Sequence, residues 1–158
     1  MPNKGKGAAA IIEKENIIIK KHIPTTSKVT DYETELVGLI LSIEAARRVI
    51  TKHSINGEKI GTISIFSKNQ EALEKSTNPF IPSAAQYLYL EIFHNIIILK
   101  KTTSIQLWWC PGHTGVTGNE LADTEAKNAA LDPTTSSFEL KPSLTKLMQE
   151  TVTERIVN

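Results

Sequence analysis

The segment from Trp108 to Asp123 carries the residue types most able to do chemistry. It reads Trp-Trp-Cys-Pro-Gly-His-Thr-Gly-Val-Thr-Gly-Asn-Glu-Leu-Ala-Asp, so an apolar run ends at a Pro-Gly turn and His113 follows in a glycine-rich loop. Gly-Asn-Glu then predicts the start of a helix with Asp123 in its first turn. The pattern places an imidazole, which can transfer protons near neutral pH, and a carboxylate near one sheet edge.

Cys110 is the only cysteine, so an intrachain disulfide is excluded. Its place at the end of an apolar run favours a small buried side chain, and a nucleophile paired with His113 is the alternative. The cysteine usage fits a reducing compartment, and we expect an intracellular protein. No signal peptide is recognised, and no apolar run is long enough to span a bilayer, so no membrane contact is expected.

Size and composition fit one globular domain. The chain has 158 residues, of which 40% are hydrophobic and 22% charged, and its formal net charge is +1. A charge this close to zero does not predict a nucleic-acid partner, so any basic footprint would have to be local.

Periodicity and turn residues predict the elements that position this segment. The predicted strands cover residues 7–12, 16–22, 60–66 and 104–110, and the predicted helices cover 31–50, 70–75, 83–99, 119–130 and 143–156. Ser83 is the expected cap of the third helix, and Gly118 or Asn119 the cap of the fourth. Because helices separate the later strands, the order implies parallel pairing beside an antiparallel hairpin, in a mixed α/β sheet. Of the adjacent Trp108 and Trp109, one is expected in the core and the other under a helix.

Three segments resemble the type 1 ribonuclease H domain, in the form carried by non-LTR retrotransposon polyproteins. They are residues 32–36, residues 63–73 and residues 109–123, and the resemblance extends over residues 5–128. The last segment, with its Pro-Gly-His-(x4)-Gly-Asn-Glu-(x2)-Asp spacing, is highly specific. The segment after the domain is similar to that of fungal-type retroelements.

The resemblance implies a fold, an activity and a set of site residues. The family cleaves the RNA strand of RNA–DNA hybrids with two Mg²⁺ ions, which are held by four carboxylates. Carried over, Glu35 and Asp123 are the metal ligands, and His113 assists proton transfer or product release. Contacts to the minor groove and 2′-hydroxyls of the hybrid are expected from Asn69, Gln70 and Asn119.

The chain departs from the family pattern at two of the four carboxylates. It begins inside the glycine-rich turn that follows the family's first, central strand, so we expect that strand and its aspartate to be absent. The third carboxylate is replaced by Lys68, which removes a negative ligand and adds a positive charge. This change should abolish binding of at least one metal and leave at most one Mg²⁺, weakly bound. We therefore expect the Lys68 ammonium to occupy the vacated region and to pair with Glu35 or Asp123.

Loss of a central strand leaves three possibilities for the sheet. The hairpin could pair directly with strand 60–66, a second copy could supply a strand, or the chain could fold poorly. A closed or gapped four-stranded sheet is the favoured outcome, and self-association at this place is a further expectation.

The sequence thus predicts a ribonuclease H-like domain over residues 1–131, followed by a linker and an amphipathic helix over 132–158. We expect this copy to be inactive or impaired. A non-catalytic nucleic-acid-binding or protein-interaction module is the alternative. An active nuclease is disfavoured, because truncation does not explain Lys68.

Overall fold

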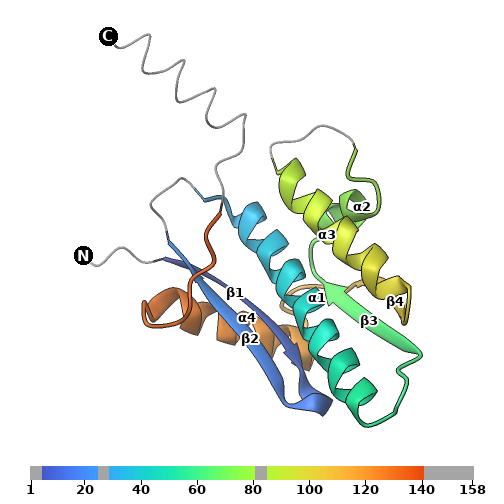
Figure 1. Cartoon of the computed structure of the whole chain (residues 1–158). Coiled ribbons are helices and arrows are strands. Elements are labelled where there is room, and N and C mark those ends of the chain that lie inside the picture. Colours follow the sequence, from blue (N-terminus) through green and yellow to red (C-terminus); the bar gives the residue numbers. More distant parts are fainter. Residues whose placement is uncertain (1–4, 25–28, 81–84, 141–158) are drawn as a thin grey trace, which may run out of the picture.

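The structure, a computed structural model, describes residues 5–24, 29–80 and 85–140 (Figure 1). Its elements are β1 (Lys6–Ile12), a short 3-10 turn (Glu13–Glu15), β2 (Ile17–Ile23), α1 (Asp31–Ile55), β3 (Thr62–Ser67), α2 (Gln70–Thr77), α3 (Gln86–Lys100), β4 (Ser104–Trp109) and α4 (Thr117–Leu131). The mixed α/β class and the element order agree with the sequence-based prediction. The helix predicted over 143–156 lies outside the described residues.

Strands β1 and β2 form an antiparallel hairpin. Lys6 lies opposite Ile23, and Ile12 lies opposite Ile17. The 3-10 turn between the strands ends at Asn16, which has a φ of 55°. Asparagine adopts this left-handed conformation more readily than other residues with a side chain, so the short connection carries little strain.

Helix α1 is the longest element, with 25 residues. Thr30 caps it, because its hydroxyl accepts from the Glu33 amide while the Glu33 carboxylate accepts from the Thr30 amide. The helix continues to Ile55, past the end predicted at residue 50. One of its faces packs on β3, β4 and α3, and another packs on the hairpin. The buried residues of the first face are Leu36, Leu39, Ile43 and Ala46, and those of the second are Val37, Leu41 and Ala45.

Strands β3 and β4 pair in parallel, with Thr62 opposite Ser104 and Ser67 opposite Trp109. Helices α2 and α3 form the connection between the two strands and cover the face that bears the larger core (Figure 1). Helix α3 begins at Gln86 after Ala85, which makes no side-chain cap bond. The cap predicted at Ser83 lies outside the described residues.

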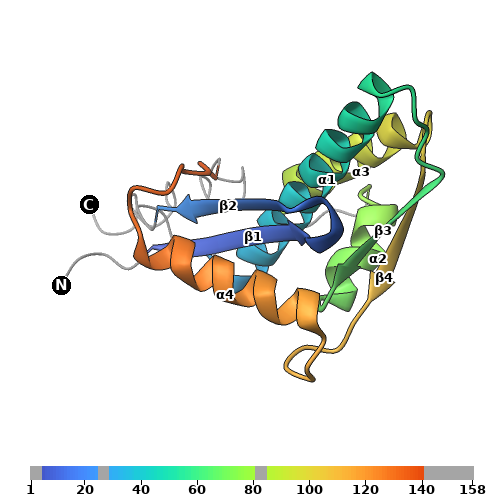
Figure 2. The ribbon, with the colours of Figure 1, turned by 90° about the horizontal axis from the view of Figure 1, so that it is seen from below.

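The two strand pairs are separate sheets. The order is β1-β2 in one and β3-β4 in the other, and no ladder between described residues joins β1 to β3. Figure 2 shows the hairpin and the β3–β4 pair on either side of α1. The gapped alternative is therefore the one observed, and direct pairing of the hairpin with β3 is not.

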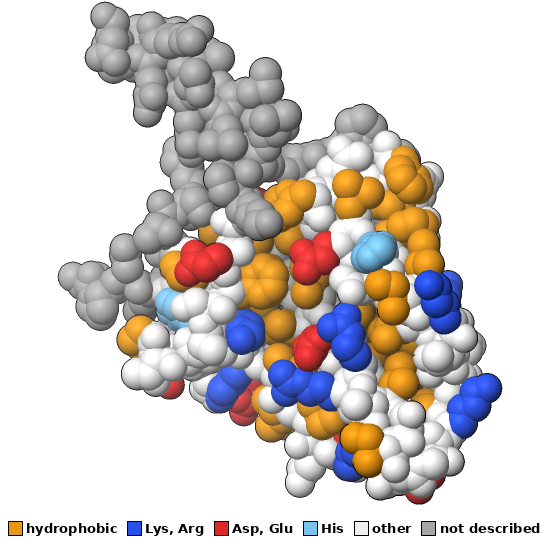
Figure 3. Space-filling model, in the orientation of Figure 1, with side chains coloured by type: hydrophobic (Ala, Val, Ile, Leu, Met, Phe, Trp, Pro, Cys, Tyr) orange, Lys and Arg blue, Asp and Glu red, His pale blue; other side chains and the backbone are white. Residues whose placement is uncertain are grey.

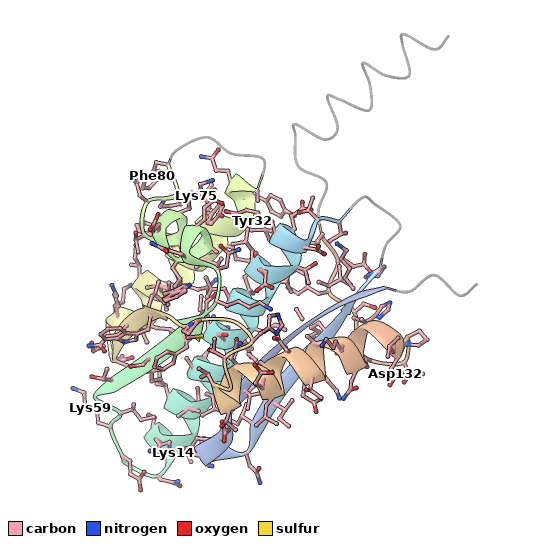
Figure 4. All side chains as sticks on the ribbon, turned by 180° about the vertical axis from the view of Figure 1, so that it is seen from behind. Lys14, Tyr32, Lys59, Lys75, Phe80 and Asp132 are labelled. Carbon is pink, nitrogen blue, oxygen red and sulfur yellow. The ribbon has the colours of Figure 1, made fainter. Side chains whose placement is uncertain are left out.

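Helix α4 crosses the hairpin on the face opposite α1 (Figures 2 and 4). The approach is so close that a Cβ atom on Gly7 would lie 1.9 Å from the Ala126 carbonyl oxygen. The helix begins at Thr117, and Val116 is its N-cap residue without a side-chain cap bond. The cap predicted at Gly118 or Asn119 is therefore wrong, and Asp123 lies in the second turn, not the first.

The expectation for the two tryptophans is also wrong. Trp108 and Trp109 are 51% and 54% exposed. Trp108 lies opposite Phe66, which is 62% exposed, on a sheet face that no described helix covers at this point. The Trp109 indole donates to the Lys68 carbonyl over 3.1 Å, so its polar group is satisfied by backbone at the end of β3. Alternation along β4 does place side chains on two faces, but a sheet of two strands leaves much of both faces open.

Candidate active site

Lys68 lies between Glu35 and Asp123. Its Nζ atom is 2.9 Å from Asp123 Oδ1 and 3.3 Å from Glu35 Oε1. The three residues come from three elements: Lys68 follows β3, Glu35 is in the second turn of α1, and Asp123 is in the second turn of α4. The structure thus brings together both predicted carboxylates and the predicted replacement, and Lys68 pairs with both carboxylates, where pairing with one was expected.

The ammonium form of Lys68 is favoured at this place. Partial burial alone lowers the pKa of the Lys68 side chain. The hydrogen bond to Asp123 and the charges of Glu35 and Asp123 act in the opposite direction and together outweigh burial, so the pKa lies above its ordinary value. Lys68 therefore carries a full positive charge at neutral pH, held between two carboxylates.

Two buried polar atoms beside this cluster have no hydrogen-bond partner among the described residues. They are Asp123 Oδ2 and Asn119 Nδ2. Both residues line a cavity of about 740 Å³ that also reaches Glu35 and Lys68. A buried polar atom without a partner costs free energy, so these two atoms mark a place where the site can accept a ligand group or water.

His113 lies in the loop between β4 and α4, on the same side as the cluster. The loop follows Lys68 closely, because a Cβ atom on Gly112 would lie 3.5 Å from the Lys68 side chain. His113 is exposed and has a φ of 55°, an uncommon conformation for a residue with a side chain. His113 is therefore open to solvent in the loop that passes Lys68, and its role stays a prediction.

Asn69 and Gln70 follow Lys68 directly and already have local partners. The Asn69 side-chain oxygen accepts from the Ala72 amide over 2.9 Å and caps α2. The Gln70 amide donates to Glu74 over 2.9 Å on the exposed face of that helix. Contacts of either side chain to a nucleic acid would therefore use the groups that these bonds leave free.

Cys110 is buried, with 5% of its surface exposed, which confirms the reading of it as a small core residue. Burial, and after it the charge of Asp123, raises the pKa of the thiol. A higher pKa disfavours the thiolate that a nucleophile needs. The alternative of a Cys110–His113 nucleophilic pair is therefore not supported.

The residues at this site do not fit the two-metal centre of the family. Mg²⁺ requires several oxygen ligands, and the described residues contain no group of three or more acidic, histidine or cysteine side chains placed to hold a metal. The Lys68 ammonium contacts both carboxylates that would be ligands. A divalent cation could bind them only by displacing a positive charge that cannot itself coordinate it.

The face seen in Figure 3 carries basic, acidic and apolar side chains intermixed. Within the described ranges, no helix has the length and apolar character needed to cross a membrane.

A second cluster of charged side chains lies at the opposite end of the cavity. Its members are Glu15, Lys52, His53 and Glu58. This cluster was not predicted from the sequence.

Comparison with known proteins gives one family match. A comparison with curated proteins finds no match. The family description RNase H matches residues 1–131, which is most of the chain. This match includes Glu35, Lys68 and Asp123, which the fold brings to one end of the cavity, and His113 of the adjacent loop. The chain therefore belongs to the ribonuclease H family.

Proposed function

We propose that this ribonuclease H domain binds RNA–DNA hybrids without performing metal-dependent cleavage of the RNA strand. The family acts on such hybrids and generally depends on divalent metal ions. The observation that carries the proposal is the contact of Lys68 Nζ with both Asp123 and Glu35, at 2.9 Å and 3.3 Å. These carboxylates are engaged by a fixed internal cation.

Electrostatics support this assignment. At an effective dielectric of about 20, two unit charges about 4 Å apart interact by about 4 kcal/mol. Lys68 replaces a negative ligand by a positive charge, so a cation bound beside it loses an attraction and gains a repulsion of this size. The penalty is several orders of magnitude in metal affinity, since about 1.4 kcal/mol corresponds to a factor of ten.

The binding half of the proposal rests on the polar groups around the Lys68 cluster. Asn119 has an unpaired buried amide nitrogen in the cavity wall, and His113 is exposed on the adjacent loop. Asn69 and Gln70 begin the helix that follows Lys68. Amide and imidazole groups of this kind can hydrogen-bond to sugar hydroxyls. Contacts of this type recognise the shape of a hybrid rather than its sequence. We also assign the chain to the type 1 domains of retroelements, on its sequence segments alone.

A paired binding and cleavage assay tests the proposal. Binding is measured by the fluorescence anisotropy of a short fluorescein-labelled RNA–DNA hybrid, with duplex DNA of the same sequence as the reference. Cleavage of the same hybrid is followed on denaturing gels in Mg²⁺ and in Mn²⁺. We expect saturable, salt-sensitive binding, a preference for the hybrid, and no cleavage in either metal.

Glu35→Gln is the matched control, because it keeps the size of the side chain and removes its charge. Cleavage by the natural sequence that disappears in Glu35→Gln would overturn the assignment of Lys68 as a block to metal binding. Absence of any hybrid binding would overturn the proposal that this domain binds RNA–DNA hybrids.

A further inference from the structure

The facing edges of β1 and β3 form the two sides of one slot. The cavity of about 740 Å³ is lined by β1 from Gly7 to Ile12 and by β3 from Thr62 to Ser67. Each strand pairs with its own neighbour, and within the described ranges neither pairs with the other (Figure 2). Each therefore presents an unpaired strand edge to the same space.

The hydrogen bonds of His22 show which groups of β1 face the slot. Its amide donates to the Ser136 carbonyl, and its carbonyl accepts from the Phe138 amide, so both groups point away from β1. His22 lies opposite Gly7, which makes this a pair without mutual hydrogen bonds. Backbone direction alternates along a strand, so the N–H and C=O groups turned toward the slot are those of Gly7, Ala9 and Ile11.

The hydrogen bonds between β3 and β4 show in the same way which groups of β3 face the slot. The carbonyls of Gly61 and Ser67 accept from amides of Ser104 and Cys110, on the side of β4. Residues at alternate positions therefore point the other way. The groups of β3 that face the slot belong to Thr62, Ser64 and Phe66.

The two edges run in opposite directions. Lys6 at the start of β1 pairs with Asp31 at the start of α1, and Glu15 beyond its end pairs with Lys52 near the end of α1. β3 ends at Ser67, and the next residue, Lys68, pairs with Glu35 near the start of α1. In Figure 4, accordingly, Lys14 and Lys59 lie at the same end of the molecule. A strand between the two edges would pair antiparallel with one and parallel with the other, and both pairings are ordinary in mixed sheets.

The walls and ends of the slot define the chemistry of its occupant. Helix α1 and helix α4 close the two faces with mostly small side chains, among them Gly38, Ser42, Ala45, Ala122 and Ala126. Charges lie at the ends. The Lys68 end carries two carboxylates against one ammonium, so it is complementary to a basic residue at one end of the occupant.

The size of the slot agrees with one short strand. Six extended residues measure roughly 20 Å in length, about 4.8 Å between neighbouring strands and about 10 Å between packed layers, or about 950 Å³. The cavity of about 740 Å³ is of the same order. A small molecule would fill part of this volume, but it would not satisfy two rows of backbone donors and acceptors.

We propose that this slot is a binding site for an extended strand of another polypeptide, about six residues long, with uncharged side chains in the middle and a basic end. The strand would complete a continuous sheet by β-augmentation on both of its edges. A second copy of the chain is a poorer donor, because all four described strands are already paired and one would have to be released. This inference goes beyond the proposed function and does not depend on hybrid binding.

The test uses the whole chain and the peptide acetyl-Lys-Thr-Val-Thr-Val-Thr-Val-Lys-amide. Amide hydrogen exchange is followed by NMR with and without the peptide. We expect exchange at the slot-facing amides to slow at least tenfold, with little change at amides already inside the two ladders. The amides to be followed are those of Gly7, Ala9, Ile11, Thr62, Ser64 and Phe66. A peptide with proline at its two central positions, which removes two donors, should give no protection.

Ser64→Pro and Ser64→Ala form the matched pair of variants. Ser64 is exposed and its amide faces the slot, so proline removes a slot donor and spares the β3–β4 ladder. We expect Ser64→Pro to weaken peptide binding at least tenfold and Ser64→Ala to leave it unchanged. If Ser64→Pro does not fold, peptides N-methylated on alternate residues provide the same comparison with the natural sequence.

Three results would overturn the proposal. The first is no peptide binding at millimolar concentration. The second is binding without protection of either edge, or equal binding by the proline-containing peptide. The third is protection of the slot amides that appears without peptide: if it rises with protein concentration, a second copy fills the slot, and if it does not, residues of the same chain outside the described ranges fill it.

Discussion

Replacing Lys68 by methionine tests whether the ammonium holds the two carboxylates together. Methionine keeps much of the length and apolar volume of the side chain and removes only its charge. The contacts of 2.9 Å and 3.3 Å to Lys68 Nζ place the two carboxylate oxygens at most about 6 Å apart. At that separation and an effective dielectric of about 20, two like charges repel by about 3 kcal/mol.

Solvent screening reduces this figure. The side chains of Lys68, Glu35 and Asp123 keep 28%, 35% and 20% of their surface exposed. We therefore expect Lys68→Met to lower the free energy of unfolding by about 2 kcal/mol at pH 7.

Urea denaturation followed by circular dichroism at pH 7 measures the difference. Lys20→Met is the matched control, because Lys20 forms an ion pair with one carboxylate, that of Glu125, over 2.8 Å. Lys20→Met should lower the free energy of unfolding by less than about 1 kcal/mol. A Lys68→Met variant as stable as the natural sequence, or one no less stable than Lys20→Met, would contradict the expected repulsion between Glu35 and Asp123.

Two further predictions concern the remainder of the fold. Hydrogen bonds that the His53 ring donates to Glu15, then to Glu58, raise the pKa of His53. The stability contributed by His53 is therefore fully present below about pH 6.5 and is lost as the pH rises through the raised value. Thermal midpoints of His53→Gln should therefore fall below those of the natural sequence at about pH 5.5 and match them at about pH 8.5; a constant difference would contradict this. A Cβ atom on Gly7 would lie 1.9 Å from the Ala126 backbone, so Gly7→Ala should lower the free energy of unfolding by about 3 kcal/mol, measured by urea denaturation. A Cβ atom on Gly61 would have nothing within 4 Å, so Gly61→Ala should lower it by less than about 0.5 kcal/mol.

The order and type of the elements could be predicted because each has a strong local signal. Alternation and turn residues indicate β1 and β2, and the capping box at Thr30 marks the start of α1. The packing of α1 was only half predicted. Its stripe at Leu36, Leu39 and Ile43 indicates one buried face, but Val37, Leu41 and Ala45 bury a second face against the hairpin. A helix buried on two sides lacks the clear polar face from which periodicity is read.

The clustering of Lys68 with an acidic side chain could be predicted, but not its detailed pairing. The spacing around His113 and Asp123 is specific, and the charge of Lys68 made an ion pair with a carboxylate the expected outcome. The sequence could not show that Lys68 reaches both carboxylates, since that depends on how closely α1 and α4 approach the end of β3. The start of α4 was also misplaced, because Val116 provides no side-chain cap that a sequence pattern could reveal.

The ion pairs and the slot together explain how two separate sheets can form one domain. Both cores use residues of α1, so this helix is the shared support of the two halves. At one end of the slot, Lys68 connects β3 to α1 and α4, and at the other end Glu15 connects the hairpin to Lys52 and His53 of α1. Backbone pairing is missing only between these ends, over the length of one strand. Lys68, which we propose opposes metal binding, therefore also closes the end of the slot, so a strand bound there should protect the Lys68 ion pairs from solvent and salt.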